Sequence, residues 1–283
     1  MIENSLEQNE IIIKELDAND DVSVEEFVAL ERLIWGQGLD FTADDIKKEI
    51  LRGEVIYVIY NGKQMVGTTS VLVQADLENP RKVIKYLPPE SLYASSVGID
   101  PAFRGNRLQG LLLEKCIELA RKLNKETILG AVRPENGASV RNITNIGGKI
   151  LAYSRDFHPD SDNPSRLVGE VDLFLQKEAW EPIDKVDALM PDEALDSLSR
   201  EEDRIIVLIQ SGDNIDSKAQ KVIEKILSND YIGTGVQTLF LDSNSIQFNG
   251  MAFRKLSSFP AEAEKRLRER KEKIQKILLK EKS

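Results

Sequence analysis

Residues 97–110 decide the fold of this chain, and they read Val97-Gly98-Ile99-Asp100-Pro101-Ala102-Phe103-Arg104-Gly105-Asn106-Arg107-Leu108-Gln109-Gly110. An apolar run that begins at residue 92 is typical of a strand, and it ends at Asp100-Pro101. After the turn, apolar residues recur at helical spacing, at Leu108, Leu111, Leu112, Cys116, Leu119, Ala120 and Leu123. A tight loop between a strand and a helix directs backbone N–H groups toward one point at the positive end of the helix dipole. The sequence therefore predicts an anion site here, with phosphate as the guest.

This loop lacks the lysine and the spacing of a Walker-type phosphate loop, and it lacks the three-glycine dinucleotide fingerprint. Residues 101–109 instead resemble the pyrophosphate-binding segment of the GNAT superfamily of acyl-CoA N-acyltransferases, whose pattern there is Gln/Arg-x-x-Gly-x-Gly/Ala. Residues 133–148, which run from Arg133-Pro134-Glu135-Asn136 to Gly147-Gly148, resemble the segment that opens the family's fourth helix. The two segments stand in the family's order and separation, so the resemblance extends over residues 10–176.

The resemblance implies an α/β (α+β) fold with a mixed, mostly antiparallel central sheet that is flanked by helices. It also implies acetyl-CoA as the cofactor, with the pantetheine arm on the strand at residues 97–99 and the pyrophosphate on residues 104–110. An N–H group of the same cleft would stabilise the charge that develops on the thioester oxygen. The cofactor-binding residues that it implies are Val97, Gly98, Ile99, Arg104, Gly105, Asn106, Arg107, Leu108, Gln109, Gly110, Asn136 and Ser139.

Three residues depart from the family pattern. Arg107 stands where the pattern has its first glycine, and Gln109 stands where it has glycine or alanine. The Arg107 guanidinium either adds a charge near a phosphate or is solvated, and the sequence leaves both readings open. Ile143 stands where many members carry the tyrosine that protonates the leaving thiolate. On this alignment the chain lacks that acid.

No constellation in the sequence identifies the acid and the base of such a reaction. Tyr153 and Tyr93 are the candidate acids, because both lie on strands that border the cleft in the family. His158, the only histidine, is the candidate base, although a single loop histidine is usually solvated. Water can serve in place of either group. The predicted catalytic residues are therefore Tyr153, Tyr93 and His158.

The composition of the chain argues against several classes of protein. A net charge of −10 argues against nucleic-acid binding through bulk electrostatics. One cysteine rules out an internal disulfide, and one histidine argues against a His-based metal site, so we expect no metal. Cys116 lies on an apolar helical stripe and is expected in the core rather than as a nucleophile. With no apolar run of about eighteen residues and no basic-then-apolar leader, we expect a cytoplasmic protein without a membrane partner.

In the part of the chain before residue 74, the sequence predicts two helices that lie between strands. The predicted elements are a strand at residues 11–16, helices that begin near Ser23 and Thr42, and a hairpin of residues 54–60 and 65–73 joined by Asn61-Gly62. In the family, the first two helices form a wall of the acceptor pocket. Trp35 and Phe41 therefore either contact substrate or pack in the core.

After residue 176 the sequence changes character, and we predict a division into three parts. These are a GNAT-like domain at residues 1–176, an acidic linker with a short helix at 177–202, and a second, smaller α/β accessory domain at 203–283, in which we recognise no family. Strands are expected at residues 149–153, 166–174, 204–210, 236–241 and 245–253, and helices at 219–227 and from residue 261. The last helix mixes Lys and Arg with Glu, so a solvated, ion-paired surface is expected there.

The sequence thus predicts an acyl-CoA-dependent N-acyltransferase that moves an acetyl group from acetyl-CoA to a primary amine. The alternative is a non-catalytic acyl-CoA-binding sensor or scaffold, which Ile143 favours. The predicted partners are acyl-CoA and an amine-bearing acceptor. For the C-terminal domain, a second copy of the chain and a macromolecular partner both stay open. The sequence leaves the acceptor, the acyl length and the oligomeric state undetermined.

Overall fold

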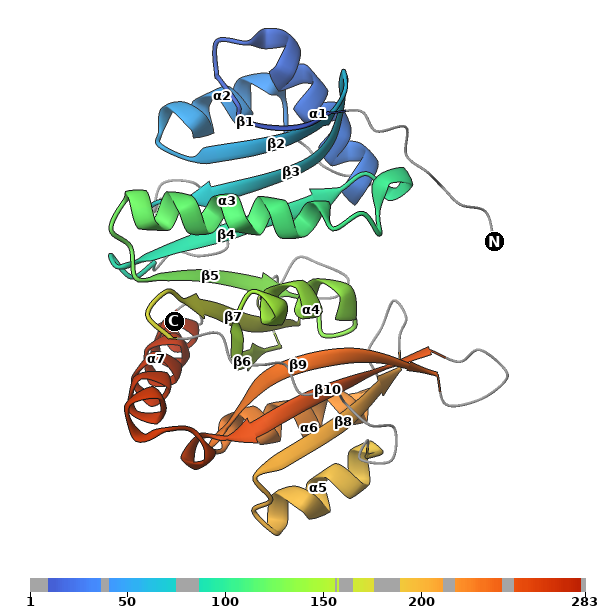
Figure 1. Ribbon diagram of the computed structural model, residues 1–283, viewed down its shortest axis with the longest axis vertical. Helices are drawn as coiled ribbons and strands as arrows, with labels where there is room; N and C mark the ends of the chain where they lie inside the picture. Colours follow the sequence, from blue (N-terminus) through green and yellow to red (C-terminus); the bar gives the residue numbers. More distant parts are fainter. Residues whose placement is uncertain are drawn as a thin grey trace. The chain divides into compact units, whose positions relative to one another are not determined.

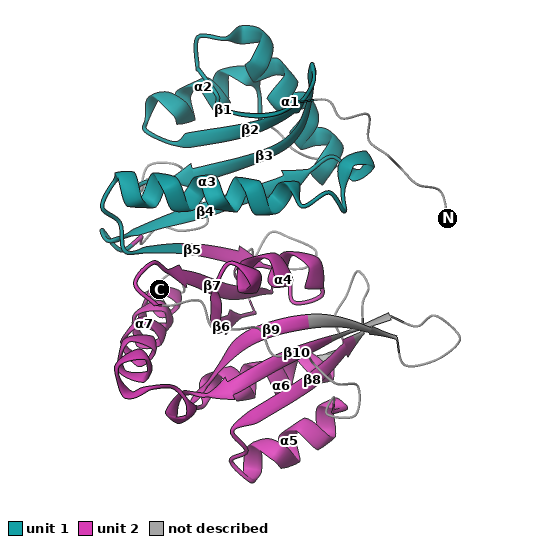
Figure 2. Cartoon of the chain, viewed as in Figure 1, with its two compact units in different colours: residues 1–74, 88–128 teal, residues 75–87, 129–283 magenta. Residues whose placement is uncertain are grey.

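The structure is a computed structural model of the chain, and it describes residues 10–36, 41–74, 87–155, 157, 165–175, 189–210, 217–240 and 247–280. The chain forms two compact units. Unit 1 contains residues 1–74 and 88–128, and unit 2 contains residues 75–87 and 129–283 (Figure 2). The predicted domain boundary at residue 176 lies outside the described residues. The division into residues 1–176, 177–202 and 203–283 therefore stays a prediction.

Unit 1 is built on antiparallel strands in the order β1-β2-β3-β4 (Figure 1). Its elements are β1 (Ile11–Glu15), α1 (Asp21–Trp35), α2 (Ala43–Leu51), β2 (Val55–Asn61), β3 (Gln64–Leu72), β4 (Ser91–Ile99), the 3₁₀ turn η1 (Pro101–Phe103) and α3 (Leu108–Lys122). Strand β5 (Thr127–Val132) begins in unit 1 and continues in unit 2. The predicted hairpin is confirmed. Strands β2 and β3 pair across a turn in which Gly62 has a φ of 62°, which glycine adopts without steric cost.

Helices cover both faces of the unit 1 sheet, because side chains alternate between the two faces along each strand. On β2, Ile56 and Val58 point into a core with α1 and α2, and Ile59 points into a second core with α3. Cys116 on α3 is fully buried, and burial raises the pKa of its thiol to about 12. A buried thiol that stays protonated is a packing residue, as the apolar stripe predicts.

The first two helices begin at side-chain caps. Thr42 caps α2 as predicted, and it forms a capping box with Asp45. The cap of α1 was expected at Ser23, but Asp20 takes this role, since its carboxylate accepts the Ser23 N–H at 3.1 Å. The carboxylate also lies at the positive end of the helix dipole, which favours the earlier start.

Unit 2 contains a second group of strands, in the order β7-β6-β9-β10-β8. Its elements are α4 (Gly137–Asn145), β6 (Lys149–Ser154), β7 (Arg166–Asp172), α5 (Pro191–Ser199), β8 (Arg204–Gln210), α6 (Ser217–Ser228), β9 (Tyr231–Phe240), β10 (Gln247–Lys255), the 3₁₀ turn η3 (Leu256–Ser258) and α7 (Ala261–Lys280). Ile150 on β6 pairs with Gly233 on β9, and one core contains Leu167 of β7 together with Val207 and Phe253 of the C-terminal strands. Among the described residues, elements on both sides of the predicted linker thus share a core.

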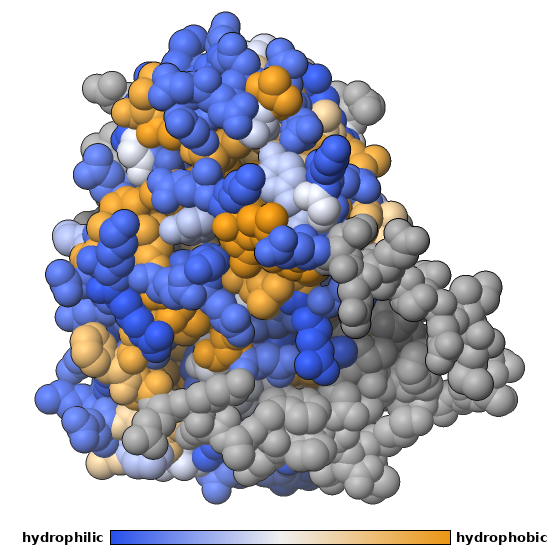
Figure 3. Space-filling view, turned by 45° about the horizontal axis from the view of Figure 1, so that its top comes forward, coloured by the Kyte–Doolittle hydropathy of each residue, from blue (hydrophilic) through white to orange (hydrophobic). Residues whose placement is uncertain are grey.

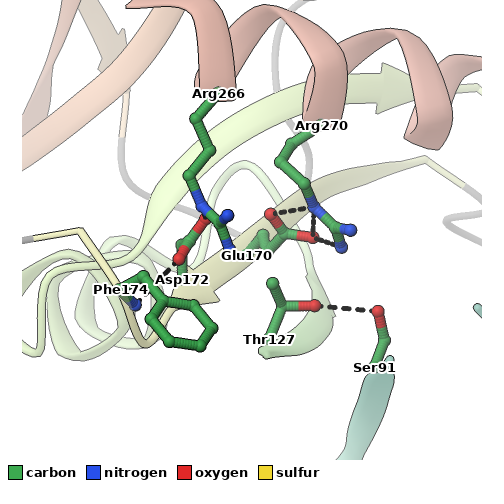
Figure 4. Close-up of polar contacts among 7 residues, drawn as sticks. All are labelled: Ser91, Thr127, Glu170, Asp172, Phe174, Arg266 and Arg270. Carbon is green, nitrogen blue, oxygen red and sulfur yellow. Dashed lines mark hydrogen bonds and ion pairs between the residues drawn. The ribbon is translucent and has the colours of Figure 1, made fainter. Parts of the chain in front are cut away.

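The last helix is less solvated than its composition predicts. Arg270 of α7 donates through Nε to Glu170 of β7 at 2.9 Å, and both side chains are almost fully buried. One turn earlier, Arg266 is paired with Asp172 and stacks on the Phe174 ring (Figure 4). The sequence pattern could not indicate this, because the carboxylates come from a strand far away in the chain.

Both units contain mostly antiparallel strands with helices packed on them, so the predicted mixed α/β fold class is confirmed. No helix of the described residues has both the length and the apolar composition that a membrane crossing requires. Among the large apolar side chains that remain exposed are Val22, Leu33, Trp35 and Leu51. Hydrophilic and hydrophobic residues are interspersed on the face that Figure 3 shows.

Candidate functional site

Strand β4 is interrupted by a β-bulge at the predicted pantetheine strand. Thr68 of β3 pairs with Gly98, but the next pair joins Ser70 to Ser95, so Ser96 and Val97 lie opposite a single residue of β3. Ser96 has a φ of 48°, a left-handed conformation that is uncommon for serine. Bulges release backbone groups from the ladder and are frequent next to active sites. Of the predicted cofactor residues, Val97 therefore lies in the bulge, and Gly98 and Ile99 follow directly after it.

Helix α1 lies directly over this segment. If a Cβ were built at Gly98, the Cζ2 atom of Trp35 would lie 3.4 Å from it. Trp35 is nevertheless 52% exposed, so its indole both packs on β4 and faces solvent. Phe41, the second predicted pocket residue, is partly buried against the core of α1 and α2. Phe41 therefore packs in the core, whereas Trp35 has an exposed face beside the bulge.

The loop after β4 is braced by its own side chains. The Asp100 carboxylate accepts the Ala102 N–H at 2.9 Å and starts the short η1 turn. Arg104 donates through Nε to the Ile99 carbonyl at 3.3 Å, and the Asn106 amide donates to the Phe103 carbonyl at 3.0 Å. These predicted phosphate ligands therefore also hold the loop in shape.

Helix α3 begins without a side-chain cap. Its N-cap residue is Arg107, which has a φ of 60° and makes no capping hydrogen bond. Gly105, two residues earlier, has a φ of 86°. The left-handed backbone explains why the family pattern has glycine where this chain has Arg107, because glycine adopts this conformation without the steric cost that a side chain brings. First-turn N–H groups that no cap side chain occupies, next to left-handed residues, are suited to bind an anion.

The last three loop residues that were predicted to bind the cofactor lie partly in the core and partly on the first turn of α3. Leu108 is buried in the core that α3 forms with the sheet. Gln109 and Gly110 are partly exposed on the first turn, and the Gly110 N–H donates to the Arg107 carbonyl at 3.0 Å. Leu108 thus anchors the helix start, whereas the exposed residues around Arg107 leave the loop accessible.

The predicted cofactor residues of unit 2 form a helix cap. Asn136 is the N-cap of α4, and its side chain accepts the Ser139 N–H at 3.1 Å. A role of Asn136 and Ser139 toward the cofactor stays a prediction. Ile143 packs against the unit 2 core, and a Cβ built at Gly148 would lie 2.6 Å from the Ile143 Cγ2 atom. This position therefore contributes packing and carries no acidic proton.

The predicted catalytic residues lie in different parts of the chain. Tyr93 is buried on β4 in unit 1. Tyr153 lies on β6 in unit 2, where burial raises the pKa of its phenol above the ordinary value. His158 lies outside the described residues. Their roles stay predictions. No group of three or more His, Cys, Asp or Glu side chains in the described ranges is arranged to hold a metal ion.

Sequence reasoning missed Glu31, a carboxyl on the inner face of α1 that is only 4% exposed. Burial raises its pKa to about 8, while the side chains of Trp35 and Thr68 act in the opposite direction. The sequence does contain a signal. Val24, Phe27 and Val28 form an apolar stripe, and position 31 continues the same helical spacing with a glutamate.

The domain around this loop has an α/β fold in which a helix without a side-chain cap follows a bulged strand. Residues 20–147 match the acetyltransferase (GNAT) family, and this part of the chain is a GNAT acetyltransferase domain. The family match does not extend into the C-terminal region. The resemblance found in the loop and in residues 133–148 is thereby confirmed.

Solved structures of acetyltransferases are similar to the chain over about three fifths of its length. A GNAT-family acetyltransferase from Streptococcus pneumoniae is 16% identical, with 58% of this chain and all of that chain covered and a TM-score of 0.47. An N-acetyltransferase from Staphylococcus aureus is 15% identical, with coverage of 58% and 99% and a TM-score of 0.46. A putative acetyltransferase from Salmonella typhimurium, solved with acetyl-CoA, is 18% identical, with coverage of 60% and 98% and a TM-score of 0.45. No curated protein sequence matches the chain significantly.

Proposed function

We propose that the protein is an acetyl-CoA-dependent N-acyltransferase that transfers the acetyl group to a primary amine. The observation that carries the proposal is the start of α3, where left-handed Gly105 and Arg107 precede a first turn that lacks a side-chain cap. Such a turn offers backbone N–H groups and a positive dipole end to a diphosphate. Residues 104–110 are therefore assigned to the pyrophosphate of the cofactor.

The bulged strand supplies the second part of the proposal. Next to Ser96 and Val97 the ladder between β3 and β4 is interrupted, and residues 97–99 are assigned to the pantetheine arm. A backbone N–H aimed at the thioester oxygen stabilises the charge that forms there when an amine attacks. Alignment of amine and thioester then contributes much of the remaining acceleration.

The proposal is tested by turnover. The full chain is incubated with acetyl-CoA and a panel of primary amines, and the release of free CoA is measured together with the acetylated product. We expect CoA release that depends on one class of amine. Release at the same slow rate with and without every amine contradicts the proposal.

Ile143 favours a second candidate, a non-catalytic acyl-CoA sensor or scaffold. The residue packs in the unit 2 core, so no tyrosine hydroxyl is available at this position to protonate a leaving thiolate. Tight binding of acetyl-CoA without CoA release across the amine panel supports the sensor, whereas release supports the enzyme.

A further inference from the structure

Two buried polar side chains lie next to each other between α1 and β3. Glu31 is 4% exposed, and Thr68 is fully buried. Within the described part of the chain, neither Glu31 Oε1 nor Thr68 Oγ1 has a hydrogen-bond partner. Burial of polar atoms without partners destabilises a fold. Packing alone therefore does not explain why this pair is polar.

The pair lies beside the bulge of the proposed cofactor strand. Thr68 is the register partner of Gly98, the residue that follows the bulge. Glu31 and Trp35 are four residues apart on α1, so they share one face of the helix. The indole of Trp35 is close enough to the Glu31 carboxyl to lower its pKa, yet half of Trp35 is exposed. The buried carboxyl thus lies beside a side chain that is itself half exposed.

The groups around Glu31 raise the pKa of its carboxyl into the range near neutral pH. Burial raises its pKa to about 8, and the charge of Glu54, just before β2, acts in the same direction. Trp35 on α1 and Thr68 on β3 oppose this shift, and β4 faces α1 here with the uncharged Gly98. A base is most effective when its pKa is close to the working pH.

We propose that Glu31 accepts the proton of the acceptor's ammonium group, an inference that rests on the proposed function. An ammonium that docks on the exposed face of Trp35 transfers one proton to the carboxylate, so that an N–H bond breaks and an O–H bond forms. The free amine then attacks the thioester carbon. A C–N bond forms and the C–S bond breaks, the nitrogen of the new amide gives up its second proton to water, and the leaving thiolate takes a proton from water. Thr68 and Trp35 lie beside the carboxylate and lower its pKa, which favours the ionised form that accepts the proton.

The test compares pH profiles of kcat/KM for the full chain, with acetyl-CoA and the amine of the panel that the wild type acetylates fastest. For the wild type, kcat/KM rises with pH and levels off near about pH 8, where the carboxylate is formed. Glu31→Gln lowers kcat/KM on the order of 100-fold at neutral pH. The kcat/KM of Glu31→Gln keeps rising with pH until the amine itself loses its proton, at about pH 10. Glu25→Gln, which removes a charge from the exposed face of the same helix, keeps the wild-type profile.

Two neighbouring variants shift the plateau in opposite directions. Thr68→Val removes a group that lowers the pKa of Glu31, so the plateau moves to higher pH. Glu54→Gln removes a charge that raises it, so the plateau moves to lower pH. A purely structural role of Glu31 would reduce activity without these shifts. Each variant is first checked for an unchanged rise in melting temperature with acetyl-CoA, which reports on the cofactor site separately.

The outcomes separate this inference from the proposed function. If Glu31→Gln keeps both the rate and the plateau of the wild type, Glu31 is not the proton acceptor, and the acyltransferase proposal stands. A wild-type kcat/KM that falls as the pH rises through the same range also overturns this role, because Glu31 would then act as a proton donor. If the wild type releases no CoA with any amine, both proposals fail.

Discussion

Ile34 on α1 lies directly against Gly98 on β4, and a Cβ built at Gly98 would lie 3.0 Å from the Ile34 Cδ1 atom. The contact holds the end of α1 over the strand segment that follows the bulge. Trp35, the next residue, also lies close to Gly98. The absence of a side chain at Gly98 therefore determines how closely α1 approaches the proposed cofactor strand.

A side chain at Gly98 should displace α1. We expect Gly98→Val to lower the free energy of unfolding by about 1–3 kcal/mol, because the added methyl groups overlap Ile34. Urea denaturation measures this loss. Gly53→Ala, at a position with open space but a φ of 98°, is the control for backbone strain without overlap. An unchanged stability of Gly98→Val would mean that α1 does not rest on β4 as described.

The loop before α3 should lose its ligand when Gly105 is replaced. Gly105 has a φ of 86°, so Gly105→Val forces the loop out of this conformation, and we expect acetyl-CoA no longer to raise the melting temperature. Gly53→Val is the matched control, since Gly53 also has a positive φ, of 98°, and open space for a Cβ, but lies outside this loop. Retained protection in Gly105→Val would place the cofactor elsewhere.

Arg107→Gly should separate the backbone strain at position 107 from a contact between the Arg107 guanidinium and a phosphate. Glycine removes the strain of a left-handed arginine, so we expect the free energy of unfolding to rise by up to about 1 kcal/mol. If the guanidinium contacts a phosphate, the same change weakens acetyl-CoA binding and makes it less dependent on salt. Thermal unfolding and titrations at two salt concentrations measure both. Unchanged binding identifies Arg107 as a solvated residue.

The buried pair of α7 should be essential for the stability of unit 2. We expect Arg270→Met to lower the free energy of unfolding by about 3–5 kcal/mol, because the buried Glu170 carboxylate loses the guanidinium of Arg270. Arg268→Met on the same helix breaks a more exposed pair with Asp230 and should cost less than about 1 kcal/mol. Equal losses in the two variants would contradict the burial of Arg270.

The pH dependence of stability should reveal Glu31 without any substrate. In the folded chain this carboxyl stays protonated up to about pH 8, whereas in the unfolded chain it ionises near the ordinary glutamate pKa of 4.5. Between these values the folded state binds more protons, so its stability falls as the pH rises. The loss is about 1.4 kcal/mol for each unit of pKa difference. Glu31→Gln should lack this fall in urea denaturation series, whereas Glu25→Gln should retain it.

Local patterns in the sequence were sufficient for several elements. The strand, loop and helix of residues 92–123 follow from apolar spacing, and the Asn61-Gly62 turn from residues that favour a positive φ. Thr42 was recognisable as a cap because its partner lies three residues away. In each case the interaction that forms the element joins residues that are close in the chain.

The bulge at Ser96 and Val97, the burial of Glu31 beside Thr68 and the pairing of Arg270 with Glu170 were decided by tertiary structure alone. Each depends on a partner that is distant in sequence, and the pattern around each residue is compatible with an ordinary strand or a solvated helix. The sequence by itself determined the GNAT character of residues 20–147, because the loop and helix motifs are local. Which charged side chains become buried next to them depends on how strands and helices pack, since burial is a property of the assembled core.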